Sequence, residues 1–230
     1  ALGEMADAIR ETTRRFSADR IAPLGLTWWA LGRVDELMRY DDATWTTMKR
    51  SGLKMVFCGA ESGSNEVLRK MNKKITTEQV LEVAAKTREH GIVPEFSFVV
   101  GNPPDPIADI EATFRFIRKL KQVNPATEII LYVYTPVAMD GTLYAEAQAA
   151  GFTFPDSLDA WTTGVWRDFA LRRDPRTPWL DLDVKKRVRA FERVLNAYYP
   201  TTTDPRLTGF RRRMLRLLGS WRYHSEFYRY

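Results

Sequence analysis

The sequence predicts an α/β fold in which parallel strands form a sheet with helices outside it, followed by a helical C-terminal region. Strand-like and helix-like segments alternate four times between Leu26 and Gly151, and the strand-like segments are continuous apolar runs. Such runs are typical of strands buried on both faces of a parallel sheet that helices cover. Right-handed crossovers would curl this sheet into an open or closed barrel. The 230 residues, 44% of them apolar, suffice for a full core.

Each strand is expected where an apolar run ends in a turn. The four expected strands are residues 26–31, 53–58, 92–101 and 128–136. The expected helices between and around them are residues 5–16, 41–52, 76–91, 107–123 and 141–151.

Capping residues and apolar spacing mark these helices. Asp41 or Asp42 is a suitable N-cap for the second helix, and Gly52 a suitable stop. Thr76 begins the third helix, which ends at His90-Gly91. In the fourth, one side is apolar and carries four residues, Ile107, Ile110, Phe114 and Ile117.

The composition changes after Gly151. Residues 152–181 are rich in Pro, Trp and Asp without clear periodicity, which predicts an ordered loop region, whereas residues 183–199 and 204–223 are amphipathic helices. We therefore expect one domain over residues 1–151 and a helical region over residues 152–230. The segment from Trp161 to Trp179 either covers the barrel mouth or supplies core and interface anchors, and the second reading is favoured.

The composition also argues against several classes of segment and of metal site. No run of about 18 uncharged apolar residues exists, so no membrane span is expected. The opening residues have no basic n-region and no apolar h-region, which argues against a signal peptide and suggests a chain cut from a longer one. Cys58 is the single cysteine, which fits a reducing cytoplasm. It also excludes a cysteine-based zinc or iron–sulfur site within this chain, so no metal ligands are expected here.

Four turns follow the expected strands, and in parallel α/β folds ligands bind at the carboxyl ends of strands. The turns are residues 32–35, 59–64, 101–105 and 134–136. A structural interpretation exists for each: Gly101 ends a strand, Asp105 caps the next helix, and Arg33 pairs with Asp35. The recurrence of polar groups at successive strand ends nevertheless favours one common site.

Glu61 is the strongest candidate among these residues. It follows an apolar strand and lies between small residues, which let a ligand approach the backbone. A carboxylate there can accept two hydrogen bonds from a vicinal diol, as acidic groups hold ribose in dinucleotide folds. Lys73, one short helix later, can meet a carboxylate, although a helix-end lysine is also favoured by the helix dipole alone.

Taken in order, these turns resemble the second half of the barrel of radical S-adenosylmethionine (radical SAM) enzymes. The four segments that carry the resemblance are TWWALGRVD, GAESGSNEVLRKMNKKITTEQV, VVGNPPDP and TPVAMDGTLYAEAQAAG. The pattern is most similar to the group with a cobalamin-binding domain that includes the anaerobic porphyrin cyclases. The resemblance covers roughly residues 5–155 and implies a partial barrel of the TIM type, namely strands 3–6 of a (βα)6 barrel.

The resemblance also implies a set of binding residues for S-adenosylmethionine. Glu61 and Ser62 would contact its ribose, and Lys73 its methionine carboxylate. The residues that would border its adenine, or line the same ring, are Val99, Gly101, Tyr134 and Thr135. Arg33 would be a further polar residue at the barrel mouth.

Several features of the family are missing from the chain. The CxxxCxxC loop that binds a [4Fe–4S] cluster is absent, as are the first two barrel strands and a glycine-rich turn. Pro104 stands where the family has Gly, Asp105 where it has Glu, and Leu53 where relatives often have Cys. We therefore expect no activity from this chain alone. Truncation at both ends explains this more economically than natural loss of the cluster in a pseudo-enzyme.

With its cluster and an electron donor, the intact parent would generate a 5′-deoxyadenosyl radical for C–H functionalisation of a small molecule or peptide. A preceding cobalamin domain would make the reaction methyl transfer or cyclisation. One alternative is a non-catalytic module whose basic C-terminal helices, within residues 206–229, dock on nucleic acid or an acidic protein. Another is a hydrolase or lyase with paired acid–base groups. Besides Glu61, the few candidates for these groups are His90, His224, Asp35 and Asp105.

Overall fold

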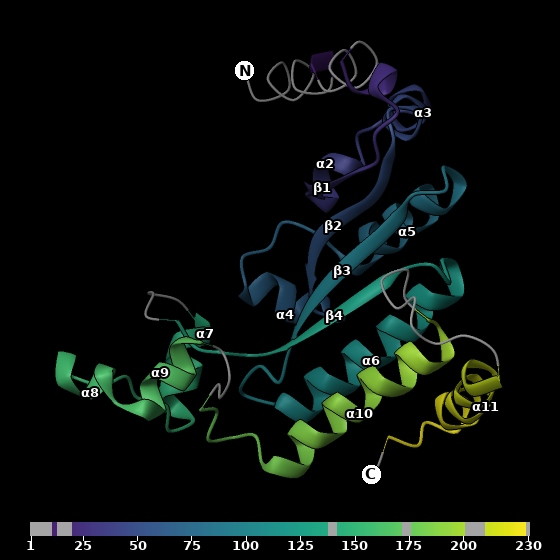
Figure 1. Cartoon of the computed structure of the whole chain (residues 1–230). Coiled ribbons are helices and arrows are strands. Elements are labelled where there is room, and N and C mark those ends of the chain that lie inside the picture. The colour runs from purple at the N-terminus through teal and green to yellow at the C-terminus, as the bar shows by residue number, and fades with distance from the viewer. Residues whose placement is uncertain (1–10, 13–19, 138–141, 172–175, 201–209, 229–230) are drawn as a thin grey trace. The chain divides into compact units, whose positions relative to one another are not determined.

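The computed structural model describes residues 11–12, 20–137, 142–171, 176–200 and 210–228 (Figure 1). Within them the chain has an α/β fold. It divides into two compact units that interleave along the sequence. The first unit consists of residues 1–61, 74–98 and 116–130, and the second of residues 62–73, 99–115 and 131–230. This division does not test the expected domain boundary near residue 151, which stays a prediction.

The sheet has four parallel strands in the order of the sequence, as the apolar runs predict. They are β1 (Trp28–Gly32), β2 (Leu53–Glu61), β3 (Val93–Val100) and β4 (Glu128–Val133). Cys58 in β2 is in register with Gly32 of β1 and with Phe96 of β3, so the carboxyl ends of neighbouring strands come to one edge. The predicted parallel sheet is confirmed.

Two helices of the first unit, α3 (Asp42–Arg50) and α5 (Thr77–Glu89), begin where the capping residues predict. This unit also contains the 3-10 helix η2 (Ala22–Leu24) and the helix α2 (Val34–Leu37). The Asp41 carboxylate accepts a hydrogen bond of 2.8 Å from the Thr44 amide at the start of α3. Thr76 and Gln79 form a reciprocal capping box at the start of α5. These caps satisfy amide groups that a helix leaves without partners.

The expectation that the strands are buried on both faces is wrong for β1 and β2. Val56, Cys58 and Ala60 in β2 are fully buried on one face, but Met55 and Phe57 on the other are only half-buried. The open face continues on β1, where Trp29 is 52% and Leu31 72% exposed. A side-chain period of two separates the faces. On β2 one face is buried and the other half-buried, and on β1 neither face is fully buried.

The second unit is mainly helical. Its helices are α4 (Asn65–Lys70), α7 (Thr142–Ala149), α8 (Leu158–Thr162), α9 (Gly164–Ala170), α10 (Leu182–Tyr198) and α11 (Phe210–His224). Helix α6 (Pro106–Val123) begins in this unit and ends in the first. The region 152–181, predicted as an ordered loop, contains the short helices α8 and α9. Its aromatic packing, rather than a helical repeat of apolar residues, stabilises them.

Helix α10 packs on the first half of α6 through aromatic rings. Phe191 is fully buried, and its ring stacks on Phe114 with centroids 3.8 Å apart, while Tyr228 meets Phe191 edge-on at 5.0 Å. Phe114, Ile110 and Ile117 form the buried side of α6, as predicted, but Ile107 is exposed. Ile107 lies in the first turn of the helix, directly after the exposed residues Pro104 and Asp105.

Some expected features fall outside the description. Most of the helix expected at residues 5–16 lies outside the described residues, as does Gly141, the first residue of the helix expected at residues 141–151. Among the described residues, no helix is both long enough and apolar enough to cross a membrane.

Candidate functional site

A buried carboxylate links the ends of two neighbouring strands within the second unit. Asp109, in the first turn of α6, accepts hydrogen bonds through Oδ2 from the amides of Gly101 and Asn102, at 2.8 and 3.0 Å. Its Oδ1 accepts from the Ser62 hydroxyl at 3.3 Å. One helix turn later, the Thr113 hydroxyl accepts from the Gly63 amide at 3.1 Å. We call these six residues the strand-end cluster: Ser62, Gly63, Gly101, Asn102, Asp109 and Thr113.

The strand-end cluster holds its carboxylate at an electrostatic cost. Burial raises the pKa of Asp109, whereas the hydrogen bonds from Asn102, Gly101 and Ser62 act in the opposite direction. Asp109 and Thr113 are both buried and lie four residues apart, on the same side of α6 as the apolar residues. The cluster therefore fixes the loops after β2 and β3 in one conformation.

The side chain of Asn102 uses its nitrogen but not its oxygen in the hydrogen bonds that the structure describes. Its Nδ2 donates to the Val99 carbonyl at 2.9 Å and to Asp109 Oδ2 at 3.0 Å, and these contacts orient the amide. Its Oδ1 is buried and has no hydrogen-bond partner among the described residues. A buried acceptor without a partner is costly unless a ligand or water supplies a donor. The end of β3 thus offers an acceptor for a bound donor such as an amino group.

Aromatic side chains pack beside the same strand end. Tyr134, Ala147, Phe152 and Phe169 form a buried cluster, and the partly buried Val99, Trp161, Trp166 and Trp179 pack against it. The Trp179 indole donates to the Gly101 carbonyl at 2.9 Å. The segment from Trp161 to Trp179 therefore supplies packing anchors, as the favoured reading of the sequence holds.

Both the backbone conformation at residue 101 and the side chain packed against it require a glycine at this position. It has a φ of +83°, which side chains rarely allow, and a Cβ there would lie 2.6 Å from Cδ1 of Leu180. Its amide and carbonyl are both used, by Asp109 and Trp179. A glycine here lets the chain turn sharply directly after β3.

Three more predicted residues lie in the second unit. The Tyr134 amide donates to the Val100 carbonyl at 2.9 Å, and its ring is 6.1 Å from that of Trp179. The Thr135 hydroxyl donates to the Val133 carbonyl at 3.3 Å. Lys73 is exposed after α4, with its amide donating to the Leu68 carbonyl at 2.9 Å.

Two predicted residues belong to the first unit. Glu61 ends β2 with a φ of +64°, a left-handed conformation that is uncommon for a residue with a side chain. Arg33 donates two hydrogen bonds to Asp35, at 3.1 and 2.8 Å, and the hydrogen bond from Arg33 is the main reason why the pKa of Asp35 is lowered. The structural interpretation of Arg33 and Asp35 as a pair is confirmed.

The structure thus brings together Ser62, Val99, Gly101 and Tyr134 within the second unit. Glu61 and Lys73 lie in different units, and their binding of one ligand stays a prediction. Sequence reasoning missed Asp109, and it assigned no role to Asn102 although the predicted turn at residues 101–105 contains that residue. Asp109 had a detectable signal, since a polar pair at 109 and 113 interrupts the apolar side of a predicted helix.

Glu95 is a further carboxylate that sequence reasoning missed. It lies on the open face of the sheet in the first unit, in register with Phe57. Burial raises its pKa, nearby Glu128 adds to this, and a hydrogen bond from the Trp29 side chain opposes it. The alternation of residues along the strand alone does not reveal this carboxylate or its raised pKa.

The chain does not fit an iron–sulfur cluster or other thiolate-bound metal. Cys58 is fully buried, and burial raises the pKa of its thiol to about 12, so it stays protonated. Among the described residues, no group of three or more His, Cys, Asp and Glu could hold a metal ion. Cys58 alone cannot hold such a cluster, which needs more than one thiolate.

The residues considered as acid–base groups of a hydrolase or lyase make structural contacts instead. His90 stacks on Trp45 in the first unit, and its Nε2 lies 3.6 Å from Asp42. Asp105 caps α6 by accepting from the Ala108 amide at 3.0 Å. Each of these groups thus has a structural partner.

In a comparison with protein families, residues 35–117 match the model described as "Radical SAM superfamily". An uncharacterized methyltransferase from Pyrococcus horikoshii is 30% identical over 97 residues, which is 42% of this chain and 20% of the relative. A tRNA-2-methylthio-N(6)-dimethylallyladenosine synthase from Wolbachia is 40% identical over 63 residues, 26% of this chain and 14% of the relative. The anaerobic magnesium-protoporphyrin IX monomethyl ester cyclase from Rubrivivax gelatinosus is 30% identical over 95 residues, 41% of this chain and 17% of the relative.

Among solved structures, the radical S-adenosylmethionine methyltransferase TsrM from Kitasatospora setae, with cobalamin and a [4Fe–4S] cluster bound, is 21% identical. The match has a TM-score of 0.42 and covers 56% of this chain and 23% of that one. The matched part is a fifth or less of each curated relative's length. The relatives' names describe three different reactions, so the similarity identifies a shared segment and not one reaction.

Proposed function

Because residues 35–117 are a radical SAM superfamily segment, we propose that this chain is the S-adenosylmethionine-binding part of a radical SAM enzyme. The observation that carries the proposal is the strand-end cluster. There the buried Asp109 joins Ser62, after β2, to Gly101 and Asn102, after β3. Ligands of parallel α/β folds bind at the carboxyl ends of strands, where these residues lie.

The proposed roles follow the chemistry of each side chain. Glu61 and Ser62 bind the ribose hydroxyls, and Lys73 pairs with the methionine carboxylate. Val99, Gly101, Tyr134 and Thr135 border the adenine, and Arg33 lies at the rim. The unpartnered Asn102 Oδ1 supports this assignment, because an amino group of the ligand would supply the missing donor.

S-Adenosylmethionine supplies the reactive sulfonium when bound, and the residues of this chain hold and orient it. A [4Fe–4S] cluster does not fit here, since Cys58 is buried and protonated, so the chain by itself is proposed to be inactive. We propose that cluster ligands, and the cobalamin domain of the group it resembles, belong to a longer parent. Methyl transfer and ring-forming chemistry on a small molecule or peptide are the proposed reaction classes, in the cytoplasm.

The proposed architecture is the C-terminal part of a (βα)6 barrel over residues 1–151, followed by a helical region over residues 152–230. The open apolar face with Trp29 and Leu31 supports this part of the proposal. A barrel strand presents such side chains to the lumen, where further strands cover them.

A matched pair of lysines tests the binding site. Lys73→Ala should weaken S-adenosylmethionine binding about tenfold, because a charge-assisted hydrogen bond contributes roughly 1.5–3 kcal/mol and each 1.4 kcal/mol is about tenfold in Kd. Lys74→Ala, which removes the neighbouring exposed lysine, should change binding less than about twofold. Saturation-transfer NMR with S-adenosylmethionine measures both. Equal losses in the two variants would show that only the general charge of the segment matters, and would refute the assignment of Lys73.

A further inference from the structure

Helix α11 packs on α10 through a narrow face and leaves a wide apolar face open. Gly219 of α11 lies against Ala197 of α10, since a Cβ on Gly219 would be only 2.9 Å from Cβ of Ala197. Tyr223 is buried, with its ring 5.1 Å from that of Tyr198. Both contacts lie on one side of α11, because residues four apart share a helix face.

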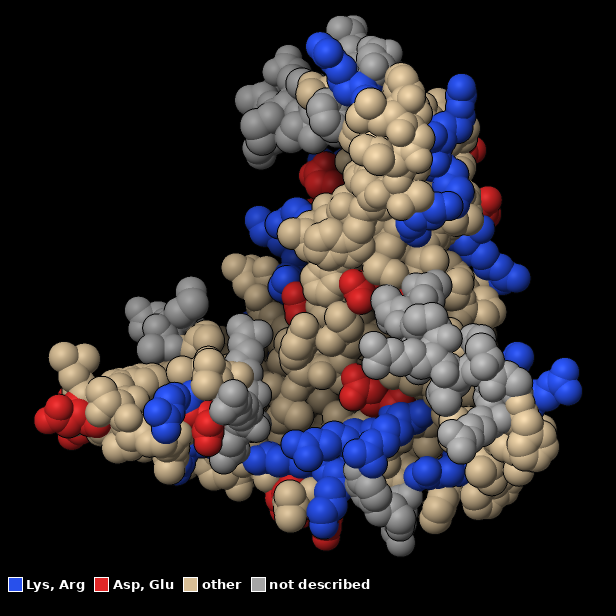
Figure 2. All heavy atoms as spheres, in the orientation of Figure 1, with Lys and Arg blue, Asp and Glu red and all other residues tan. Residues whose placement is uncertain are grey.

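The opposite side of α11 is apolar and exposed to solvent. Its five large apolar residues, each between 41% and 76% exposed, form what we call the apolar stripe: Phe210, Met214, Leu217, Leu218 and Trp221. Their spacings of three, four and seven residues place them along one face of the helix. In Figure 2 the surface over α11 is mostly tan. Contiguous exposed apolar patches mark interaction sites.

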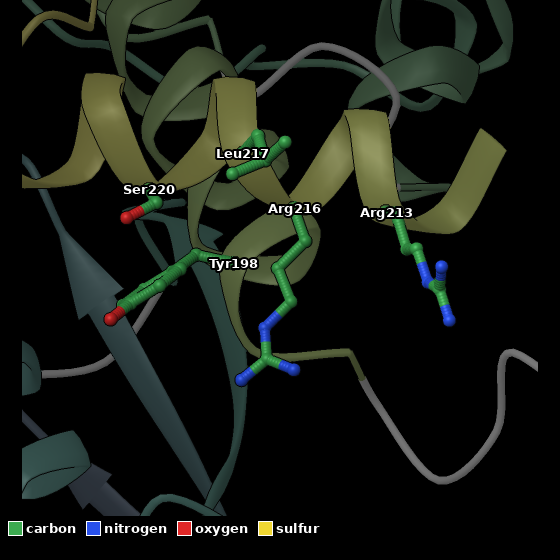
Figure 3. A pocket seen from close by; sticks show the side chains of 5 residues that line it. All are labelled: Tyr198, Arg213, Arg216, Leu217 and Ser220. Atoms are coloured by element: carbon green, nitrogen blue, oxygen red, sulfur yellow. The ribbon is translucent and has the colours of Figure 1, made fainter. Parts of the chain in front are cut away.

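A cationic pocket adjoins this stripe. A cavity of about 340 Å³ lies between the end of α10 and α11, and we call it the arginine pocket after its lining: Tyr198, Arg213, Arg216, Leu217 and Ser220. Figure 3 shows the hydroxyl ends of Tyr198 and Ser220 on one side of Arg216. Among the described residues, neither Arg213 nor Arg216 has a carboxylate partner. Leu217 belongs to both the pocket and the stripe.

The charge around the stripe decides among possible occupants. From Phe210 to Ser225 the sequence has five arginines and no Asp or Glu. A second copy of α11 would bring arginines against arginines, which is unfavourable. Nucleic acid would satisfy the arginines but would leave the leucine, methionine and tryptophan side chains uncovered. A surface that is anionic and apolar at once satisfies both features.

We propose that α11 is a membrane-surface helix that binds bilayers containing anionic phospholipids. The apolar stripe enters the boundary between headgroups and acyl chains, and the arginine pocket holds a lipid phosphate. Basic amphipathic helices with Trp, Phe and Leu on the apolar face bind in this way, and guanidinium groups bind phosphate through paired donors. The proposal goes beyond the S-adenosylmethionine site and does not depend on it.

Vesicle flotation of the whole chain tests the proposal. The chain should float with vesicles of mixed phosphatidylcholine and phosphatidylglycerol and not with phosphatidylcholine alone. Arg213→Glu/Arg216→Glu should weaken this binding by at least about tenfold, since each basic residue near an anionic surface is worth roughly 1 kcal/mol. The control Lys186→Glu/Arg189→Glu makes the same charge change at the same spacing on α10, and binding should fall less than threefold.

The apolar stripe has its own matched pair. Leu217→Ser should weaken flotation several-fold, whereas Leu182→Ser on α10 should not, although the two leucines are 65% and 63% exposed. Lipids brominated in the acyl chain should quench tryptophan fluorescence in the chain, and Trp221→Phe should abolish most of that quenching.

Several results would overturn the proposal. One is equal weakening by the α10 and α11 charge reversals, which would mean diffuse attraction. Others are binding to inorganic phosphate, RNA or an acidic peptide without binding to anionic vesicles, or flotation without tryptophan quenching. All the substituted side chains are exposed, so unchanged thermal unfolding should accompany every variant.

Discussion

Replacing Asp109 by alanine should lower the free energy of unfolding by about 3 kcal/mol. The substitution leaves the buried amides of Gly101 and Asn102 and the Ser62 hydroxyl without their acceptor, and each unsatisfied buried donor costs roughly 1–3 kcal/mol. Loss of the buried carboxylate's desolvation penalty offsets part of this cost. Urea unfolding followed by circular dichroism measures the change, and hydrogen exchange at Gly101 should accelerate.

Asp105→Ala is the matched control, because Asp105 lies in the same turn but is an exposed N-cap. Its loss should cost only about 1 kcal/mol.

Asp109→Asn keeps an acceptor for the two amides and should be less destabilising than Asp109→Ala. Because the pKa of Asp109 is raised in the folded chain, the wild type should lose stability relative to Asp109→Asn as pH rises from about 4 through that pKa. An Asp109→Ala variant no less stable than Asp105→Ala would contradict the role given to the strand-end cluster.

Phe191→Ala should destabilise the chain by about 4 kcal/mol. The Phe191 ring is fully buried, stacks on Phe114 and meets Tyr228 edge-on, so truncation leaves a cavity between α6 and α10. Removing a buried phenylalanine typically costs 3–5 kcal/mol, the transfer free energy plus that of the cavity. Differential scanning calorimetry should show the transition moved to lower temperature.

Phe210→Ala is the comparison for Phe191, since the same side chain is exposed on α11. Its removal should change stability by less than about 0.5 kcal/mol. A Phe191→Ala variant as stable as Phe210→Ala would mean that α10 does not pack on α6 in solution.

The fold was largely predictable from the sequence, because its signals are local. Apolar runs bounded by turns gave the four strands, and caps such as Asp41 and Thr76 gave the starts of α3 and α5. Periodicity could not give α8 and α9, whose five and seven residues are too few to establish a repeat. Their packing depends on aromatic contacts between residues far apart in the sequence, such as Trp166 with Phe152.

The candidate site was predictable only in part. The rule about strand ends selected Ser62 and Gly101, which the structure brings together through Asp109. Asp109 itself was missed, because an acidic residue in the first turn of a helix is expected from the helix dipole alone. For Arg33 the structure confirms the local pairing with Asp35, two residues away, and its place at the barrel mouth stays a prediction.

The central claim is that the strand-end cluster is a ligand site, and amide NMR tests it most directly. Titrating S-adenosylmethionine into the ¹⁵N-labelled chain should shift the amide signals of Ser62, Gly101 and Asn102 together, with one saturable Kd. The amides of α11 should stay in place. Signals of these three residues that do not move at millimolar S-adenosylmethionine, or shifts confined to other parts of the chain, would contradict the account.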